Sequence, residues 1–368
     1  MHQERLTRLI EAMRTEKFDA IALNPGPSFY YMTGLSFHLM ERPIVFIISR
    51  SEKPTLILPE LERSKGERAD LDLELISYGE DDASRGQAFQ QASTQLDLDH
   101  RRIGVEPLRL RVFELRLLES ASPGADILSC EETLSSLRIV KDGNEKDAIR
   151  RAVLVAEEAL RATLPLIRVG MSEQELASEL TMQILRAGLE PAMPFKPIVA
   201  SGPNSALPHA TPTDRKLKIG DLLIIDWGAT VEGYISDITR TFAIGGIDAE
   251  LEKIHSIVQR SNAAGREAVK PGVACQEIDR ASRAVIENAG YGPFFIHRTG
   301  HGIGLEAHEH PNIREGNLQT LVPGMTFTVE PGIYLTDRGG VRVEDNMVVT
   351  DSGGESLSTY NRQLEVIA

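Results

Sequence analysis

An internal repeat in the second part of the sequence constrains the fold more than any other feature of this chain. The segment Gly170–Leu176 recurs as Gly272–Ile278, and the matched residues lie 102 positions apart. Each copy reads as a helix, a glycine turn, a second helix and a glycine stop, and Ser172 with Glu175 forms a capping box in the first copy. A solenoid requires three or more repeats, so two copies predict one domain made of two pseudo-symmetric halves.

The repeat continues from the helices into β-strands that end in acidic residues. Residues 219–228 align with residues 323–332 at an offset of 104, which places Asp226 on Glu330. In each half, a turn and a second apolar run follow, and this run leads to another acidic residue. The two halves therefore predict two hairpins, each of which brings a pair of carboxylates together.

The second acids of the two pairs are Asp237 and Glu344. A turn centred between Val231 and Glu232 would place Asp226 directly opposite Asp237 on one face, with Cβ atoms about 5 Å apart. Opposed acids repel each other unless one is protonated or a cation neutralises the pair. Any one of these acids alone would be assigned to the solvent-exposed surface. The duplicated placement beside buried strands indicates instead a metal site, because an unpaired buried carboxylate is very costly.

A histidine-rich segment adds an imidazole to this acidic set. His297, His301 and His308 lie within twelve positions, and the glycines that flank His301 suit a strand that a backbone or ligand approaches closely. A lone histidine is usually structural, whereas three among small residues favour a site. Oxygen ligands with one imidazole favour hard or borderline divalent ions, and four carboxylates would balance the charge of two such ions. We therefore expect two manganese ions, with cobalt or zinc as alternatives.

The first part of the chain has a different pattern, which predicts a separate small domain. Amphipathic segments alternate there with short β-rich runs, namely Ala20–Leu23, Ile44–Ile48, Thr55–Leu58 and Ile103–Val105. The pattern changes near residue 131, and residues 142–144 start a long helix. We therefore expect a mixed α/β (α+β) chain with an N-terminal domain over residues 1–131 and a second domain over residues 132–368.

Composition excludes several classes of function. The chain has 368 residues, and 40 basic against 54 acidic residues give a formal charge of −14, with no basic cluster suited to nucleic acid. It contains no apolar run of about 18 residues and no basic-then-apolar leader, so we expect neither a membrane span nor export. Cys130 and Cys275 lack the spacing of zinc or redox sites and are expected to be buried thiols. A cytoplasmic protein is the natural expectation.

These motifs resemble those of the creatinase/methionine-aminopeptidase clan of pita-bread metallopeptidases, above all its proline-directed branch of Xaa-Pro dipeptidases (prolidases) and aminopeptidase P. The residues that carry the resemblance are Ser205–His209, Asp226–Gly228, Ser236–Thr241, Thr299–Gly304, Thr328–Gly332 and Val341–Asp345. Pro25–Leu35 and Leu137–Asp142 extend it over nearly the whole chain. The resemblance implies a creatinase-like N-terminal domain, a catalytic pita-bread domain with a pseudo-two-fold axis, and a homodimer.

The resemblance also implies a role for each metal ligand. Two divalent ions about 3.5 Å apart would share the site. Asp226 would bind one ion, His301 and Glu330 would bind the other, and Asp237 and Glu344 would bridge both. Glu330 is the family's candidate for the residue that shuttles a proton to the leaving nitrogen.

Further residues are implied to contact the substrate, a di- or oligopeptide with proline in its second position. His209 and His308 would contact the scissile group and stabilise the developing oxyanion, and His297 would line the proline side of the pocket. Arg342 would orient a bridging carboxylate or meet the substrate. A plain ion pair is the alternative interpretation of Arg342.

The resemblance leaves other functions open. Methionine aminopeptidases share the ligands but generally lack a domain like residues 1–131, and creatinases lack the ligands. A metal-dependent C–N hydrolase of a small metabolite and a non-catalytic binding protein are weaker alternatives.

The choice between dipeptidase and aminopeptidase P is the closest one. Some prolidases place an arginine after the His-Glu-x-Pro motif to bind the free carboxylate of a dipeptide, whereas Asn312 and Ile313 follow Pro311 here. Arg314 is a candidate substitute or a solvated loop residue. We expect an Xaa-Pro dipeptidase, with aminopeptidase P as the alternative.

Overall fold

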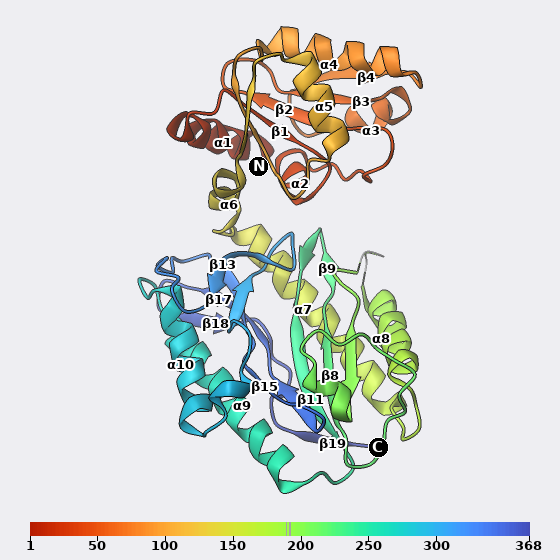
Figure 1. The fold of residues 1–368 in the computed structure, drawn as a ribbon, viewed down its shortest axis with the longest axis vertical. Coiled ribbons are helices and arrows are strands. Elements are labelled where there is room, and N and C mark those ends of the chain that lie inside the picture. Colours follow the sequence, from red (N-terminus) through yellow and green to blue (C-terminus); the bar gives the residue numbers. More distant parts are fainter. Residues whose placement is uncertain (189, 191–192) are drawn as a thin grey trace. The chain divides into compact units, whose positions relative to one another are not determined.

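The chain folds into two compact units, Met1–Arg138 and Ile139–Ala368 (Figure 1). The computed structural model describes residues 1–188, 190 and 193–368. The units divide after Arg138, whereas the sequence pattern predicts a boundary after residue 131. The difference is helix α6 (Glu131–Arg138). This helix belongs to the first unit because the side chains of Arg8 and Tyr31 both donate hydrogen bonds to the carbonyl oxygen of Leu137, at 3.2 and 3.1 Å.

The first unit is a mixed β-sheet packed against helices. The strand order is β4-β3-β2-β1-β5-β6, in which β2 is antiparallel to both of its neighbours and the other pairs are parallel. Its elements are α1 (His2–Glu16), β1 (Ala20–Leu23), α2 (Pro27–Thr33), β2 (Val45–Ser49), β3 (Thr55–Pro59), η1 (Glu60–Glu62), α3 (Arg63–Gly66), β4 (Glu74–Tyr78), α4 (Asp82–Leu96), β5 (Arg102–Val105), α5 (Val112–Ala121), β6 (Asp126–Ser129) and α6. The four predicted runs are β1, β2, β3 and β5. Strands β4 and β6 escape prediction because both are only partly buried and lack a continuous apolar run.

The second unit alternates helix pairs with strands, as the repeat predicts. The first half holds α7 (Gly143–Thr163), η2 (Leu164–Leu166), α8 (Glu173–Ala187), β7 (Ile198–Ser201), η3 (Gly202–Ala206), β8 (Leu222–Trp227), β9 (Thr230–Val231), β10 (Tyr234–Ile235) and β11 (Ile238–Ile244). The second half holds α9 (Ala249–Ala268), α10 (Cys275–Asn288), η4 (Gly292–Phe294), β12 (Gly300–Gly302), β13 (Glu309–Ile313), β14 (Thr326–Val329), β15 (Gly332–Leu335), β16 (Gly339–Arg342), β17 (Asp345–Val349), β18 (Gly354–Ser356) and β19 (Glu365–Ile367).

Equivalent backbone contacts recur in both halves of the second unit. The N–H of Gly170 donates to the carbonyl of Leu217 at 2.9 Å, and the N–H of Gly272 donates to that of Leu321 at 2.8 Å. The capping box predicted at the start of α8 is present. The predicted pseudo-symmetry is therefore confirmed at the level of individual hydrogen bonds.

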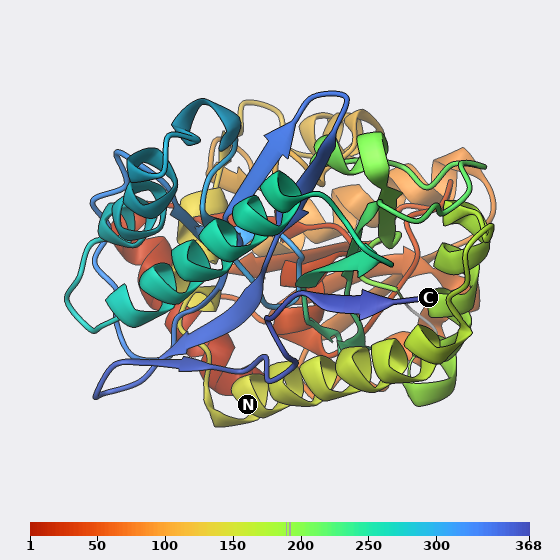
Figure 2. The same cartoon turned by 90° about the horizontal axis from the view of Figure 1, so that it is seen from below.

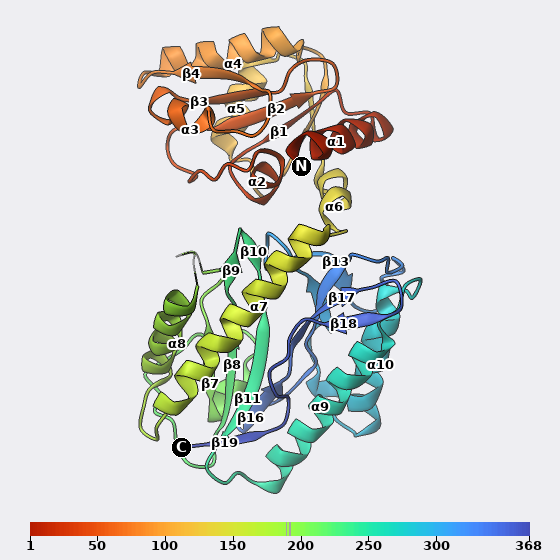
Figure 3. The same cartoon turned by 180° about the vertical axis from the view of Figure 1, so that it is seen from behind.

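Helix α7 starts where the sequence predicts a long helix and covers the first half's sheet. Asp142 and Glu145 form a capping box at its N-terminus, and Ala148, Ile149, Ala152, Val153 and Ala156 are all fully buried. Trp227 on β8 donates its indole N–H to the carbonyl of Ala156 at 2.8 Å. Figure 3 shows α7 lying across these strands.

The strands of the second unit form two main sheets. The first has the order β19-β11-β8-β7, and the second has the order β13-β12-β14-β17-β18. Strand β19 runs parallel to β11, with Phe242 paired to Glu365, so the last strand of the chain joins the sheet of the first half (Figure 2). Asp226 lies on β8, His301 on β12 and Arg342 on β16. Asp237 directly precedes β11, Glu330 directly follows β14, and Glu344 lies between β16 and β17.

The expectations about the two cysteines and about membrane-spanning helices can be compared with the structure. Cys130 and Cys275 are buried free thiols, as predicted. Among the described residues, no helix combines the length and the apolar character needed to cross a membrane.

Candidate metal centre and active site

The first predicted hairpin forms, but its register differs from the predicted one. Asp226 on β8 pairs with Thr239 on β11 rather than with Asp237. The turn is formed by Glu232 and Gly233, whose φ angles of 52° and 77° suit a type I′ turn. Its centre lies one position later than predicted, so the prediction that Asp226 directly opposes Asp237 is wrong.

Asp237 still enters the site, because it lies two residues before Thr239 and therefore on the same face of the hairpin as Asp226. The two strands approach each other closely beside it, since a Cβ on Gly228 would lie 1.9 Å from the carbonyl oxygen of Ser236. Asn346 fixes the backbone of Asp237: its Oδ1 accepts from the Asp237 N–H at 3.1 Å, and its Nδ2 donates to the Asp237 carbonyl at 2.6 Å. The backbone that carries this carboxylate is thereby fixed just before β11.

The second hairpin follows the predicted arrangement. The ladders β14–β17 and β15–β16 share one register, in which Val329 pairs with Asp345. Continued by one residue along each strand, this register places Glu330 across from Glu344. Thr239 connects the two halves here, because its hydroxyl donates to Glu344 Oε2 at 2.7 Å.

Strand β12 carries His301 in a space that only glycine neighbours allow. A Cβ on Gly300 would lie 1.8 Å from the carbonyl oxygen of Thr328, and one on Gly302 would lie 2.1 Å from that of His310. The close backbone approach predicted for these glycines is confirmed. His301 therefore projects from a strand that is closely packed on both sides.

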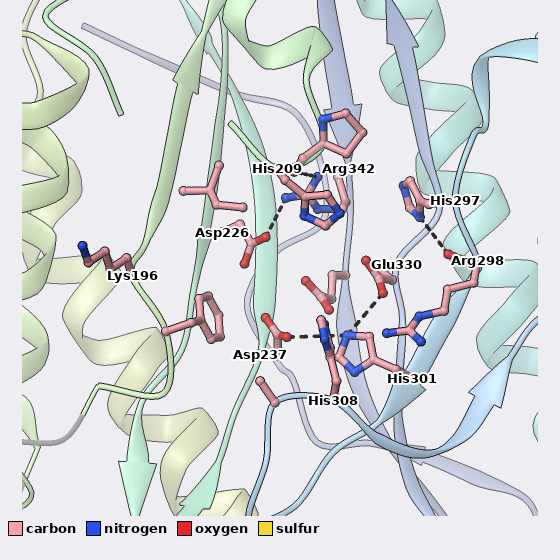
Figure 4. Close-up of a pocket in the computed structure, with 15 residues that line it drawn as sticks. Lys196, His209, Asp226, Asp237, His297, Arg298, His301, His308, Glu330 and Arg342 are labelled. Carbon is pink, nitrogen blue, oxygen red and sulfur yellow. Dashed lines mark hydrogen bonds and ion pairs between the residues drawn. The ribbon is translucent and has the colours of Figure 1, made fainter. Parts of the chain in front are cut away.

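The hydrogen bonds of His301 define its tautomer. Nδ1 lies 3.1 Å from the carbonyl oxygen of Gly302, which can only accept, so Nδ1 carries the proton. The lone pair of Nε2 then points towards Glu330 Oε1 at 3.3 Å and Asp237 Oδ2 at 3.7 Å (Figure 4). Burial lowers the pKa of His301, so no ring proton separates the lone pair from these carboxylates. A cation between them resolves the repulsion.

One cavity of about 400 Å³ collects every candidate residue. Its lining includes His209, Asp226, Asp237, His297, His301, His308, Glu330, Arg342 and Glu344. The cavity also exposes residues that the sequence did not single out, namely Phe195, Lys196, Ile198, Pro208, Arg298 and Ala307.

The acidic groups of the cavity fit divalent cations. Burial and the neighbouring carboxylates raise the pKa of Asp237 and of Glu344, and burial raises the pKa of Glu330 to about 8. Asp226 Oδ1 and Glu344 Oε1 are buried, and neither oxygen has a hydrogen-bond partner in the part of the chain that the structure describes. Asp237, His301 and Glu344 offer ligand atoms within 4.8 Å of one another. Unpartnered oxygens and one imidazole lone pair are the donors that hard or borderline ions prefer.

Arg342 is committed to the protein's own groups. Its Nη2 donates to Asp226 Oδ2 at 2.6 Å, and its Nη1 donates to the Tyr334 hydroxyl at 2.9 Å. Its Nε donates to the Thr239 hydroxyl at 3.1 Å. This arrangement favours the ion-pair interpretation of Arg342, and its partner is Asp226 rather than a carboxylate expected to bridge two ions.

His297 has both ring nitrogens occupied. Nδ1 donates to the carbonyl oxygen of Arg298 at 2.7 Å, and Nε2 accepts from the Tyr334 hydroxyl at 2.8 Å. Burial lowers the pKa of His297 to about 4, which keeps the ring neutral. The ring therefore presents carbon atoms to the cavity and offers no N–H to a ligand.

His209 and His308 differ from the other histidines of the cavity. Both are exposed, and neither ring forms a hydrogen bond with any described residue. His308 packs edge-on against His301, with ring centroids 4.3 Å apart, and the partial desolvation of its ring lowers its pKa. Their N–H groups are thus available to a ligand that enters the cavity.

Two residues that support the site have weak sequence signals. Thr239 lies within the Asp237-to-Thr241 motif, and its distance of two residues from Asp237 is the signal that could have identified it. Tyr334 bridges Arg342 and His297, and burial raises its pKa to about 12. Only the three-dimensional arrangement reveals this role.

Comparisons with known proteins agree with this geometry. Residues 147–351 match the model of metallopeptidase family M24, and residues 5–140 match that of the creatinase/prolidase N-terminal domain. The chain is 33% identical over 365 residues to the Xaa-Pro dipeptidase of Pyrococcus furiosus, covering 98% of this chain and 99% of the relative.

Solved structures are similar to this protein over nearly the whole chain. A dipeptidase from Pyrococcus horikoshii OT3 superposes with a TM-score of 0.94 at 34% identity, covering 99% of this chain and 100% of the other. An X-Pro aminopeptidase from Thermotoga maritima MSB8 superposes with a TM-score of 0.86 at 32% identity, covering 98% of this chain and 99% of the other.

Proposed function

The chain belongs to metallopeptidase family M24 and is a metallopeptidase, and we propose that it hydrolyses the Xaa-Pro bond of dipeptides. The observation that carries this proposal is the convergence of four carboxylates and one imidazole on a single cavity. The relative named Xaa-Pro dipeptidase supports the substrate class. The similar X-Pro aminopeptidase structure supports the alternative, an enzyme that also acts on longer peptides.

The proposed metal ligands are Asp226, Asp237, His301, Glu330 and Glu344. We assign manganese to the site because oxygen donors dominate it, with cobalt or zinc as alternatives. When bound, two such ions lower the pKa of a water molecule and so supply a nucleophile near neutral pH.

The remaining chemistry falls to side chains at the mouth and floor of the cavity. His209 and His308 donate N–H hydrogen bonds to the scissile carbonyl oxygen and stabilise the negative charge that develops on it. Glu330 takes up the proton released by the nucleophile on a carboxylate oxygen and delivers it to the prolyl nitrogen. This delivery is needed because an amine anion is a poor leaving group.

A substrate with proline after the scissile bond suits the other side of the cavity. The imide nitrogen of proline lacks an N–H, so a pocket that depends on this donor fails to bind it. His297 needs no such donor, because its nitrogens are already paired with Arg298 and Tyr334. Its carbon edge, together with the apolar surface of Phe195 and Ile198, suits the pyrrolidine ring.

We also propose a cellular location and an oligomeric state for the protein. Two free buried thiols support a reducing, cytoplasmic location. A homodimer is proposed from the family resemblance, and sedimentation equilibrium of the purified protein tests it. A mass of one chain, 40.5 kDa, at micromolar concentration would contradict the dimer.

The central test is a metal-loaded assay with Ala-Pro, Ala-Pro-Ala and the proline-free dipeptide Ala-Ala. We expect rapid cleavage of Ala-Pro and little cleavage of Ala-Ala. Cleavage of Ala-Pro-Ala at a rate comparable to that of Ala-Pro would establish the aminopeptidase alternative. Failure to cleave either proline peptide would favour a metabolite C–N hydrolase.

A further inference from the structure

We propose that Glu173 is a positioning residue for His209, because its buried carboxylate joins the two ends of the loop that carries this histidine. The loop runs from Ser201 to Thr213 and is called the His209 loop here. The inference rests on the proposed function, in which His209 donates a hydrogen bond to the scissile carbonyl oxygen. It deepens that function by naming the group that sets the direction of this bond. Glu173 is the first residue of α8 and is not among the residues lining the described cavity, so it acts through the loop.

The carboxylate of Glu173 gives one oxygen to each end of the His209 loop. Its Oε1 accepts from the N–H and the hydroxyl of Ser201 at 2.7 and 2.8 Å. Its Oε2 accepts from the N–H and the hydroxyl of Thr213 at 3.0 and 2.6 Å. The side-chain amide of Asn204 lies between them and donates to both oxygens, at 3.2 and 3.1 Å. One planar group therefore fixes the separation of the two ends of the loop.

Burial makes these hydrogen bonds difficult to replace. Glu173 and Ser201 are both fully buried, so water cannot take over a bond that is lost. Arg215 orients the Ser201 hydroxyl, because its Nη1 donates to this oxygen at 2.7 Å and leaves the hydroxyl proton for Glu173. A displacement of either end of the loop would leave a buried carboxylate oxygen without a donor, which is unfavourable.

The middle of the His209 loop has few backbone hydrogen bonds that fix its position. Pro208 and Pro212, which lie on either side of the histidine, carry no N–H. Leu207 and Ala210 close short turns by donating their N–H groups to the carbonyls of Asn204 and Leu207, at 3.1 and 3.2 Å. Short turns hold neighbouring residues but do not place the loop as a whole. The path of the loop therefore depends on its ends and on its contacts with other strands.

The contacts with other strands come from β16. The Ser205 hydroxyl accepts from the Gly340 N–H at 2.8 Å, and Arg342 Nη1 donates to the carbonyl oxygen of Pro208 at 3.2 Å. Figure 4 shows His209 beside Arg342 at the cavity. The loop is thus held at its base by the buried carboxylate and near its tip by β16, and the two attachments together aim the histidine at the cavity.

The repeat shows that the helical frame does not require an acid at the first position of α8. The offset of 102 aligns Glu173 with Cys275, which begins α10 with a buried thiol. In that half the acid is Asp279, whose Oδ1 accepts from the N–H and the hydroxyl of Thr299 at 3.2 and 2.6 Å and so holds the segment that leads to His301. The position of the acid therefore follows the segment that carries a site histidine and not the repeat.

The first test measures kcat and KM for Ala-Pro on the manganese-loaded enzyme. Glu173→Gln keeps the size of the side chain but turns one acceptor into a donor, which releases one end of the loop. We expect kcat to fall about 10- to 100-fold, because a misplacement of about 1 Å has effects of this order. KM should stay within about 3-fold of the wild type, because the oxyanion that His209 stabilises forms only in the transition state.

A double variant separates positioning of His209 from a general effect on the fold. His209→Ala should lower kcat about 100- to 1000-fold, as expected for an oxyanion donor. Adding Glu173→Gln should lower kcat by less than about 2-fold more, because no histidine remains to be positioned. Thr213→Val removes one donor at the end of the loop and should show a smaller loss with the same dependence on His209, which keeps the test decisive where Glu173→Gln does not fold. Losses that multiply in the double variants would overturn the inference.

Glu157 provides a matched control. It is a fully buried acid of α7 that accepts from the Tyr360 N–H and the Thr359 hydroxyl, both at 2.7 Å, and it is not among the residues lining the described cavity. Glu157→Gln should lower the urea midpoint as Glu173→Gln does, yet keep kcat within about 2-fold of the wild type. An equal loss of kcat in Glu157→Gln and Glu173→Gln would overturn the inference.

Nuclear magnetic resonance of the histidine ring C–H groups provides a readout that does not depend on turnover. The protein is loaded with zinc, which is diamagnetic, and His209→Ala assigns the His209 signal. Glu173→Gln should shift or broaden this signal more than those of His297 and His301, and an unchanged His209 signal would overturn the inference. Absence of any cleavage of proline peptides by the wild type would overturn the proposed function instead, and the His209 signal would still decide the role of Glu173.

Discussion

Replacing Thr239 by valine should weaken metal binding without removing any proposed ligand. The Thr239 hydroxyl donates to Glu344 Oε2 at 2.7 Å and accepts from Arg342 Nε at 3.1 Å. Both Thr239 and Glu344 are almost completely buried, so water cannot replace the lost bonds. Valine keeps the shape of threonine and removes only its donor and acceptor.

The size of the effect follows from the hydrogen bond to Glu344. A buried hydrogen bond to a charged group contributes about 1.5–3 kcal/mol, which corresponds to a roughly 10- to 150-fold change in an equilibrium constant. Partners that orient metal ligands have effects of this order, about 10- to 100-fold. We expect the affinity of at least one ion to fall by such a factor in Thr239→Val.

The assay is a competition titration with a chromophoric chelator of known affinity, performed with manganese and repeated with zinc. Thr239→Ser is the matched control, because it keeps the hydroxyl and should bind metal within about 3-fold of the wild type. Far-ultraviolet circular dichroism establishes that both variants are folded. Equal metal affinity of the wild type and Thr239→Val would refute the idea that Thr239 orients Glu344 for metal binding.

Three further predictions address the ligands, the acid groups and the packing of the site. Asp237→Asn should lower the metal content towards one ion per chain and abolish activity; retention of two ions by mass spectrometry would refute the bridging assignment. In the metal-free protein, burial raises the pKa of Glu330 from 4.5 to about 8, so the folded state holds an extra proton between these values. The free energy of unfolding, measured by urea titration, should therefore fall as pH rises from about 5 to 8. A free energy of unfolding that does not change with pH in either the wild type or Glu330→Gln would contradict this. Gly304→Ala should cost about 1–3 kcal/mol of stability by urea titration, because its Cβ would lie 2.7 Å from Glu309 Oε2 and 2.9 Å from Lys141 Cε, displacing a buried ion pair; an unchanged urea midpoint would show that the pair moves freely.

The sequence predicts the duplicated halves and the donor set because both depend on residue type and spacing. The register of the first hairpin could not be predicted in this way. A type I′ turn requires positive φ at both central residues, and the glycine at position 233 satisfies one of them, but the glutamate at position 232 is not a residue that marks such a position. The shift of one residue changes the partner of Asp226 to Thr239.

The roles of the arginines in the cavity also depend on three-dimensional contacts. Arg342 and Arg298 are both close in sequence to proposed ligands, yet one is saturated by the chain and the other is not. Sequence spacing does not distinguish these states, because Asp226 lies in the other half of the domain and the contacts of Tyr334 and Asn312 depend on how neighbouring strands pair. The same holds for His297, whose tautomer follows from the hydroxyl of Tyr334.

The pairing of β19 with β11 has a consequence for biosynthesis. The sheet that presents Asp226 gains its edge strand from residues 365–367, which leave the ribosome after both helix pairs. Until then, β11 offers open backbone donors and acceptors on that side, and such an edge can pair with other chains. Completion of this sheet therefore waits for the synthesis of residues 365–367, and nascent chains stalled before residue 365 should be sensitive to aggregation and to proteases, while chains that include these residues should not.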